Sequence, residues 1–181
     1  MTVVNFALLA GLAVAQAGTP DDAESGGFST CIPETYEDAL DCLAEVLDAE
    51  NEARLLGYRF NELSLLHHGF GTGLRNAWLW GERSPAASDM LERGFVHPDD
   101  MSSAIITGFW ARENGCDYPI EPVIAWYAAY WTASAQEREN THEGEAVVTP
   151  NEDNSFTMPL PVCPFDLSGY PPGREPTVVE Y

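Results

Sequence analysis

The stretch HHGFGTGLRNAWLWGE, residues 67–82, decides the fold because it admits two very different interpretations. Its glycines could belong to a dinucleotide-binding loop, which requires the spacing G-x-G-x-x-G directly after a strand. Leu74 stands three residues after Gly71, and the residues before the glycines follow a helical pattern. The phosphate-loop pattern fails as well, since no Gly-Lys-Ser/Thr occurs. The stretch therefore predicts a helix in the interior of a bundle.

The three glycines of this helix need a packing reason, because each costs about 1 kcal/mol relative to alanine inside a helix. Gly69 and Gly73 are one turn apart, so they predict a face on which a neighbouring helix packs closely. A break in the helix near Gly71 is the alternative. Trp78 and Trp80 are expected to supply bulk on the same helix.

Helix-boundary signals divide residues 31–140 into about five or six helices. Thr35 followed by Asp38 predicts a capping box. Proline after a capping residue marks further starts and glycine marks ends. The predicted starts are Ser84-Pro85 and His97-Pro98, and the predicted ends are Gly94 and Gly115. Gly57 predicts a break, Asn61 predicts a cap, and Pro119 or Pro122 precedes the last long helix. We predict an all-α, small single-domain helical bundle, with a Pro-rich acidic tail (141–181) packed on it and one short strand near 146–149.

The charge balance restricts the partners. The chain has 29 acidic and 8 basic residues, a formal charge of -21. Phosphate backbones and anionic lipid surfaces repel such a chain, so we expect no nucleic-acid partner. The charge either keeps the protein soluble or provides a surface for cations and basic partners.

The N-terminus predicts export. Residues 3–14 are nearly all apolar, and Ala15-Gln16-Ala17 fits the pattern before a signal-peptidase cut. We expect a signal peptide at 1–17, a flexible leader at 18–30, and a periplasmic or secreted mature protein with no membrane span. No Lys or Arg precedes the apolar run, so a buried N-terminal helix is the alternative.

Four cysteines agree with an oxidising compartment. Cys31, Cys42, Cys116 and Cys163 all follow the expected cut, and an even number suits two disulfides. Three connectivities are open, and free thiols are the alternative. One bridge is expected to hold the tail, which contains Cys163, to the helical body.

His67 and the segment HPDDMS, 97–102, are the candidate catalytic or metal-ligating groups. His67 shares a helical stripe with Leu63, Phe70, Leu74 and Trp78, which predicts an inward side chain. His97, Asp99 and Asp100 could act in a relay or bind a metal, but the same letters form a good helix start. No complete metal site or cofactor motif is present, so none is predicted.

Arg75, with Asn76 and Trp78, is the candidate ligand-binding group. An arginine among apolar neighbours requires a carboxylate partner, for which Asp99 and Asp100 are available. The result is either an ion pair between two helices or a clamp for a ligand anion.

These motifs together resemble an uncharacterised family of small bacterial helical proteins, a domain of unknown function. The resemblance rests on IPETYEDAL, on His67-x-Gly69-x-Gly71-x-x-x-Arg75-Asn76-x-Trp78, on Leu91-x-x-Gly94 with HPDDMS, and on a Tyr-x-x-Tyr-Trp ending. It covers about residues 32–132 and implies an all-helical fold but no activity. It also implies that the two halves of the signature meet: His67, Arg75 and Asn76 against His97, Asp99 and Asp100.

Two functions follow as hypotheses. The first is an exported, non-enzymatic domain that binds an unknown protein or small molecule, or belongs to the cell envelope. The second is a hydrolase or metal-dependent enzyme that uses His67, His97, Asp99 and Asp100.

Overall fold

The computed structural model describes residues 27–81, 84–142 and 158–174, and it confirms the all-α class. Within these ranges no strand forms beyond one isolated bridge. The α-helices are α2 (Tyr36–Val46), α3 (Ala49–Leu56), α4 (Phe70–Leu74), α5 (Pro85–Arg93), α6 (Pro98–Glu113) and α7 (Ile120–His142). A 3-10 helix, η1 (Phe28–Thr30), precedes them, and a second 3-10 helix, η2 (Phe60–Leu66), and a π-helical turn, η3 (Arg75–Leu79), lie between them.

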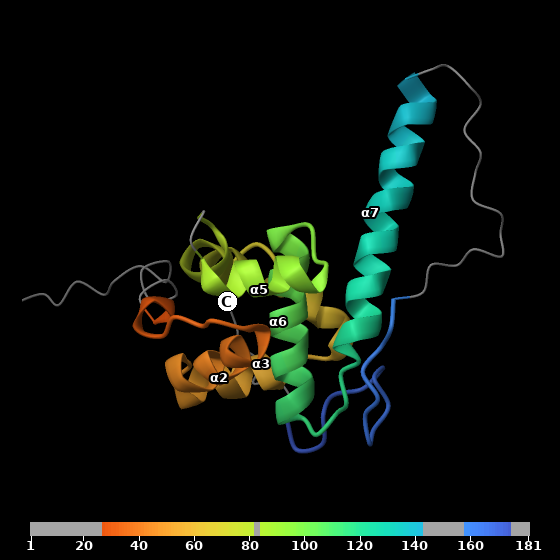
Figure 1. Ribbon diagram of the computed structural model, residues 1–181. Coiled ribbons are helices and arrows are strands. Elements are labelled where there is room, and N and C mark those ends of the chain that lie inside the picture. The colour runs from red at the N-terminus through yellow and green to blue at the C-terminus, as the bar shows by residue number, and fades with distance from the viewer. Residues whose placement is uncertain (1–26, 82–83, 143–157, 175–181) are drawn as a thin grey trace, which may run out of the picture.

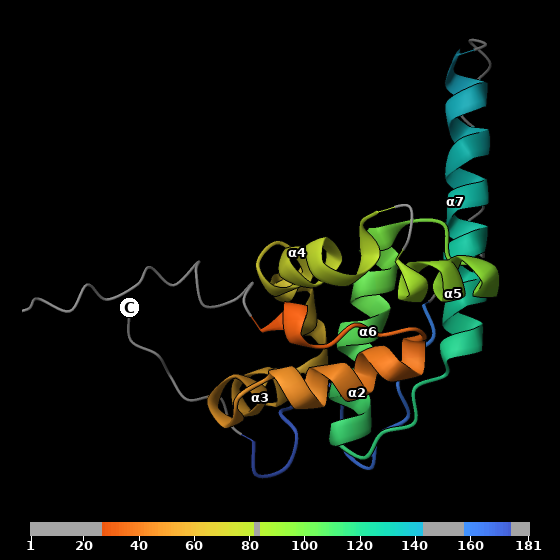
Figure 2. The same cartoon turned by 60° about the vertical axis from the view of Figure 1, so that its left-hand side comes forward.

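Helix α6 is the centre of the body, and it contacts α2, α3, α4, α5 and α7 (Figure 1). Its broad apolar surface explains this position, because Ile105, Phe109 and Trp110 are completely buried. Helix α7 packs on α6 by its first turns and then projects away from the body, as both views show (Figure 2). Among the described residues, no helix combines the length and apolarity needed to span a membrane.

Local capping chemistry sets the helix starts where the sequence predicted them. Thr35 Oγ1 accepts the N–H of Asp38, and the Asp38 carboxylate accepts the N–H of Thr35, each at 3.1 Å. Ser84 caps α5, with proline in its first turn, and Gly94 ends it at a φ of 115°. This positive φ explains the glycine, since side chains rarely adopt it.

The stretch 67–80 does not form the continuous helix predicted from its pattern. It enters from η2, turns at residues 67–69, and then forms α4 and η3. Asn61 is not the cap of η2; Arg59 holds that position, and its N–H donates to the Glu62 carboxylate at 2.9 Å.

The glycine that packs closely is Gly71, and the prediction for Gly69 and Gly73 is wrong. Gly69 is exposed in the turn, whereas Gly71 is buried. A Cβ on Gly71 would lie 3.2 Å from the carbonyl oxygen of Leu66 and 3.1 Å from Nη1 of Arg75. The break moves the helical register, and the register determines which glycine faces the neighbours.

Two further residues differ from expectation. Trp80 lies beyond the end of η3 and is 53% exposed, so it supplies no bulk to the core. Phe28 is 3% exposed and sits in η1, so the body already begins inside the leader expected at 18–30.

Both disulfides are present. Cys31 pairs with Cys42, and Cys116 pairs with Cys163. The second bridge joins the segment between α6 and α7 to the C-terminal segment, as expected for Cys163. Asp117 and Val162 add an antiparallel bridge beside it, with N···O distances of 2.9 and 2.8 Å. The strand expected at 146–149 lies outside the described residues.

Candidate functional site

Arg75 is the buried centre of a polar cluster, which we define as His67, Thr72, Arg75, Asp99 and Ser102. The residue is 6% exposed and points from η3 toward the N-terminal end of α6. Its Nε lies 3.0 Å from Asp99 Oδ1, and its Nη1 donates to Ser102 Oγ at 2.9 Å. Its Nη2 donates to Thr72 Oγ1 at 3.0 Å and to the carbonyl of His67 at 3.2 Å. The guanidinium thus has an acceptor at each of its three nitrogens.

The partners of Arg75 are placed by helical periodicity. Asp99 and Ser102 are three residues apart on α6, so both reach the same side. Ser102 is completely buried, and its hydroxyl also donates to the carbonyl of Asp99 at 2.9 Å. Thr72 stands three residues before Arg75 and reaches it in the same way. The sequence therefore contained a signal for Thr72 and Ser102, which were not predicted as partners.

The two histidines lie at the edge of the polar cluster. His67 is turned less inward than its stripe predicted: its side chain is 34% exposed, and Nε2 is 3.9 Å from Asp99 Oδ1. His97 caps α6, because its Nδ1 accepts the N–H of Asp99 at 3.2 Å. The same Nδ1 lies 3.3 Å from Asp99 Oδ2. We assign the contact as the cap, since an atom that accepts the N–H carries no proton to donate to the carboxylate.

Asp100 points away from Arg75 and joins α6 to α7. Its Oδ2 accepts a hydrogen bond from Nε1 of Trp131 at 2.5 Å, and the Trp131 ring stacks on His97 with centroids 5.5 Å apart. Burial raises the pKa of Asp100 above its usual range, although the Trp131 hydrogen bond and His97 oppose this shift. The Asp100 charge, in turn, adds to the burial that raises the pKa of Tyr127 on α7.

The expected meeting of the two signature halves is correct for Arg75, His67 and Asp99 and wrong for Asn76. Asn76 is exposed on η3 and makes no side-chain contact with the polar cluster in the part of the chain that is described. The π-helical turn explains this, because it directs Arg75 toward α6 and leaves the next residue on the outside.

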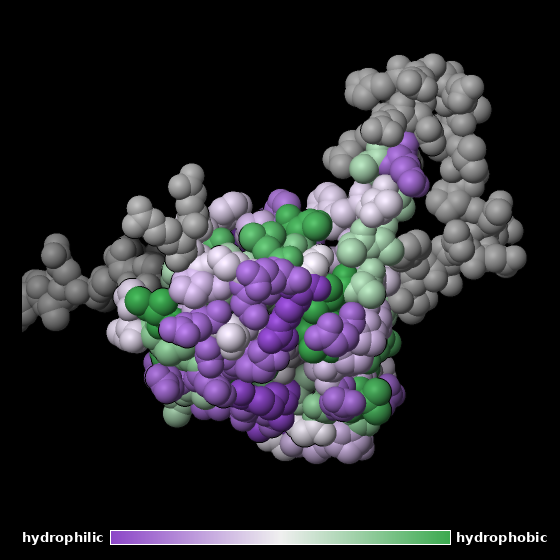
Figure 3. Space-filling model, in the orientation of Figure 1, coloured by the Kyte–Doolittle hydropathy of each residue, from purple (hydrophilic) through white to green (hydrophobic). Residues whose placement is uncertain are grey.

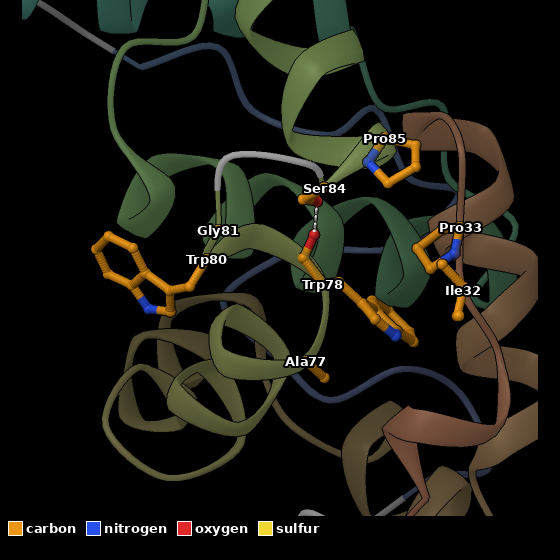
Figure 4. Close-up of a pocket in the computed structure, with 8 residues that line it drawn as sticks. All are labelled: Ile32, Pro33, Ala77, Trp78, Trp80, Gly81, Ser84 and Pro85. Carbon is orange, nitrogen blue, oxygen red and sulfur yellow. Dashed lines mark hydrogen bonds between the residues drawn. The ribbon is translucent and has the colours of Figure 1, made fainter.

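Trp78 belongs to a different feature, an apolar pocket on the other side of η3 (Figure 4). The pocket has a volume of about 480 Å³. Among the described residues, its lining contains no charged side chain and consists of Ile32, Pro33, Ala77, Trp78, Trp80, Gly81, Ser84 and Pro85. Ile32 and Pro33 form one wall, and the end of η3 with the start of α5 forms the other (Figure 4).

Hydrogen bonds and a disulfide fix the wall and floor of the apolar pocket. Nε1 of Trp78 donates to the carbonyls of Phe28 and Cys31, at 2.8 and 2.9 Å. Cys31, which directly precedes the wall residue Ile32, forms a disulfide with Cys42 of α2. The Ser84 hydroxyl donates to the carbonyl of Trp78 and accepts the N–H of Ala87. The apolar pocket is therefore preformed. Trp78 alone among its lining residues was a predicted ligand contact.

The surface around α2 and α3 is strongly hydrophilic (Figure 3). The chain has no lysine, and the structure describes the side chains of six of its eight arginines. Each of these six is engaged within the fold: Arg54 with Asn51, Arg59 over the Tyr170 ring, Arg75 with Asp99, Arg93 with Glu37 and Asp89, Arg112 with Asp41, and Arg174 with the Glu113 carbonyl. Acidic residues such as Glu34, Asp38 and Glu45 are exposed. The described surface is therefore acidic, and the described arginine side chains contact other groups of the fold.

The described residues include no group of three or more His, Cys, Asp or Glu side chains arranged to hold a metal ion.

A comparison with curated proteins and a comparison with solved structures found no match. A family model does match, from Ile32 to the end of α6 at Glu113. The matched part contains the whole polar cluster and every residue that lines the apolar pocket, whereas Trp131, α7 and the C-terminal segment lie outside it. Residues 32–113 are thus similar to the family described as Domain of unknown function (DUF6794).

Proposed function

We propose that this chain is an exported, acidic helical domain that acts by binding and not by catalysis, in the periplasm or outside the cell. The observation that carries the proposal is the state of Arg75. This residue is the best candidate for an anion clamp, and each of its nitrogens already lies against an acceptor of the fold.

Binding a ligand anion at Arg75 would require breaking these contacts in a buried position, which is costly. The neighbouring candidate residues have structural roles of the same kind. Asp99 holds Arg75, His97 caps α6, and Asp100 holds Trp131 of α7. These roles support a polar cluster that connects η3 to α6, with a separate contact from α6 to α7, and the surface of the domain is then the place for function.

Export is supported by the two disulfides together with the apolar N-terminal run of the sequence. Disulfides persist in oxidising compartments and are rare in the cytosol. The acidic, lysine-free composition agrees with a domain that stays soluble outside the cytoplasm.

The alternative is a hydrolase that uses His67 as a general base oriented by Asp99. The half-exposed ring of His67, 3.9 Å from Asp99 Oδ1, is the observation in its favour. A nucleophile is harder to assign, because the Ser102 hydroxyl in this cluster is completely buried and is already both donor and acceptor. The binding function is therefore better supported.

The test is to express the full chain, with its own N-terminus, in a bacterial host that has an oxidising periplasm. We expect the protein in the periplasmic fraction, with an intact mass that corresponds to residues 18–181 and two disulfides. Elemental analysis of the same sample should find no stoichiometric transition metal. Retention of residues 1–17 in the cytosol would contradict export, and one equivalent of zinc or iron would contradict a purely binding role.

A further inference from the structure

The polar cluster and the two disulfides stabilise the fold, but they assign no function to the apolar pocket. Its lining places two exposed large apolar side chains at one concave surface. Ile32 is 75% exposed and Trp80 is 53% exposed. Exposed apolar groups that gather around a concave surface mark interaction sites more often than scattered ones do.

We propose that the apolar pocket binds a cationic polypeptide segment of a partner protein, which inserts an apolar side chain beside Ile32. This rests on the proposed binding function and names its partner. The inserted side chain would lie against Trp78, on the side of the pocket where Ile32, Pro33 and Pro85 gather (Figure 4).

The preformed walls favour this occupant. The Cys31–Cys42 disulfide and the two hydrogen bonds of Trp78 hold the pocket in one shape, so little ordering is required when a ligand arrives. Grooves lined by tryptophan and proline are suited to extended peptide segments. A small apolar molecule is usually buried over most of its surface, and the exposed walls of this pocket would leave much of it in water.

The charge of the domain determines which sign of charge a partner segment should carry. The lining itself is uncharged, and Glu34, directly after the wall residue Pro33, is exposed. Glu82 and Arg83, between two lining residues, cancel formally. The chain as a whole carries -21, and each of the six arginines whose side chains are described is engaged within the fold. Such a field attracts cationic segments and repels a second copy of the same acidic chain.

The experiment uses a display library of random dodecapeptides, selected on the full mature chain with its disulfides intact. The selected peptides should be enriched in arginine or lysine around at least one large apolar residue. Their affinity, measured by calorimetry, should fall as salt rises, since surface charges are screened.

Ala77→Arg tests the place, because Ala77 is an exposed lining residue and arginine would fill and charge the pocket. We expect a loss of affinity of about tenfold or more. Leu65→Arg is the matched control: it makes the same charge change at a 72% exposed apolar position outside the lining, and it should change affinity less than about twofold. Ile32→Ala truncates a 75% exposed lining residue without adding charge and guards against misfolding of the arginine variant.

Equal losses in the two arginine variants would show that net charge alone is sensed and would overturn the pocket as the site. Peptides that bind all three variants normally would overturn it too, while leaving a binding function elsewhere on the domain. Enrichment of neutral or acidic peptides, or no enrichment, would overturn the cationic partner. None of these results depends on whether the chain is exported or carries a metal, so the two proposals fail separately.

Discussion

The polar cluster and the apolar pocket are built on the same π-helical turn, yet they have opposite properties. Arg75 and Trp78 are three residues apart in η3. Arg75 reaches α6, where each of its nitrogens finds an acceptor. Trp78 reaches η1 with its N–H and forms the floor of a pocket whose walls remain exposed. One turn thus carries an interior ion pair with hydrogen bonds and an exposed apolar surface.

The difference teaches where to look for function in this domain. Residue types usually associated with catalysis, histidine, aspartate and arginine, form the contact that holds the helices together. The surface available to a partner is made of isoleucine, proline and tryptophan. The two regions should therefore respond differently to substitution: stability in the first, binding in the second.

Arg75→Ala should have the largest effect on stability. It leaves Asp99 without its partner and opens a cavity, so we expect the free energy of unfolding to fall by about 4 kcal/mol. Urea denaturation without reductant measures it. Arg93→Ala is the control, because Arg93 pairs with Glu37 and Asp89 at the surface and should cost about 1 kcal/mol. Equal effects of the two variants would contradict a special role for the polar cluster.

Replacing both Cys31 and Cys42 by serine should come next. The bridge spans 11 residues, for which chain entropy predicts a loss of about 3 kcal/mol. Because this bridge anchors the wall of the apolar pocket, affinity for the selected peptides should also fall, measured by calorimetry under conditions where the variant is folded. A variant that is destabilised but binds normally would show that the wall does not depend on the disulfide.

Trp131→Phe should have a smaller effect, about 1 kcal/mol. Phenylalanine retains an aromatic ring against His97 but cannot donate to Asp100. Urea denaturation and the helical circular dichroism signal would report whether α7 remains docked. A loss as large as that of Arg75→Ala would mean that the α7 contact belongs to the polar cluster itself.

Asp100→Asn tests the pH dependence of the same contact. Burial raises the pKa of Asp100 in the folded state, so the protonated form is favoured by folding. Its stabilising contribution is present below the unfolded-state pKa and is lost as the pH rises through the folded-state pKa. The stability of the wild type relative to the asparagine variant should therefore fall as the pH rises above about 4, the usual pKa of an aspartate in an unfolded chain. A relative gain over this range would refute the assignment.

Ala77→Arg should have the smallest effect on stability, within about 0.5 kcal/mol, because Ala77 is exposed and contributes nothing to the core. The expected result is a variant that unfolds like the wild type and binds peptides poorly. Thermal unfolding provides the check. A strongly destabilised variant would mean that the apolar pocket is part of the packing, contrary to the comparison above.

The sequence predicted those features that depend on a few neighbouring residues. The Thr35 capping box, the Ser84-Pro85 start, the Gly94 end and the His97 start all agree with the structure, because each is a local hydrogen-bonding or dihedral requirement. The ion pair of Arg75 with Asp99 could be predicted for a related reason, because a buried arginine in a chain with few basic residues needs a carboxylate.

The sequence failed where tertiary contacts decide the register. Helical periodicity carried through residues 67–69 pointed to Gly69 and Gly73, whereas the turn there gives Gly71 the close contact. It also placed Trp80 inside, although the helix ends one residue earlier. The apolar pocket could not be predicted, because its two walls are more than 40 residues apart in the chain and meet only through the fold.

The Cys116–Cys163 bridge has a consequence for the covalent topology of the chain. It closes a ring that contains all of α7 and the residues that follow it up to the bridge. A protease that cuts once anywhere between the two cysteines opens the ring without releasing either piece. Such a nicked protein keeps its full mass on a non-reducing gel and separates into two bands only after reduction. The C-terminal segment would thus outlast a cut in the chain that leads to it.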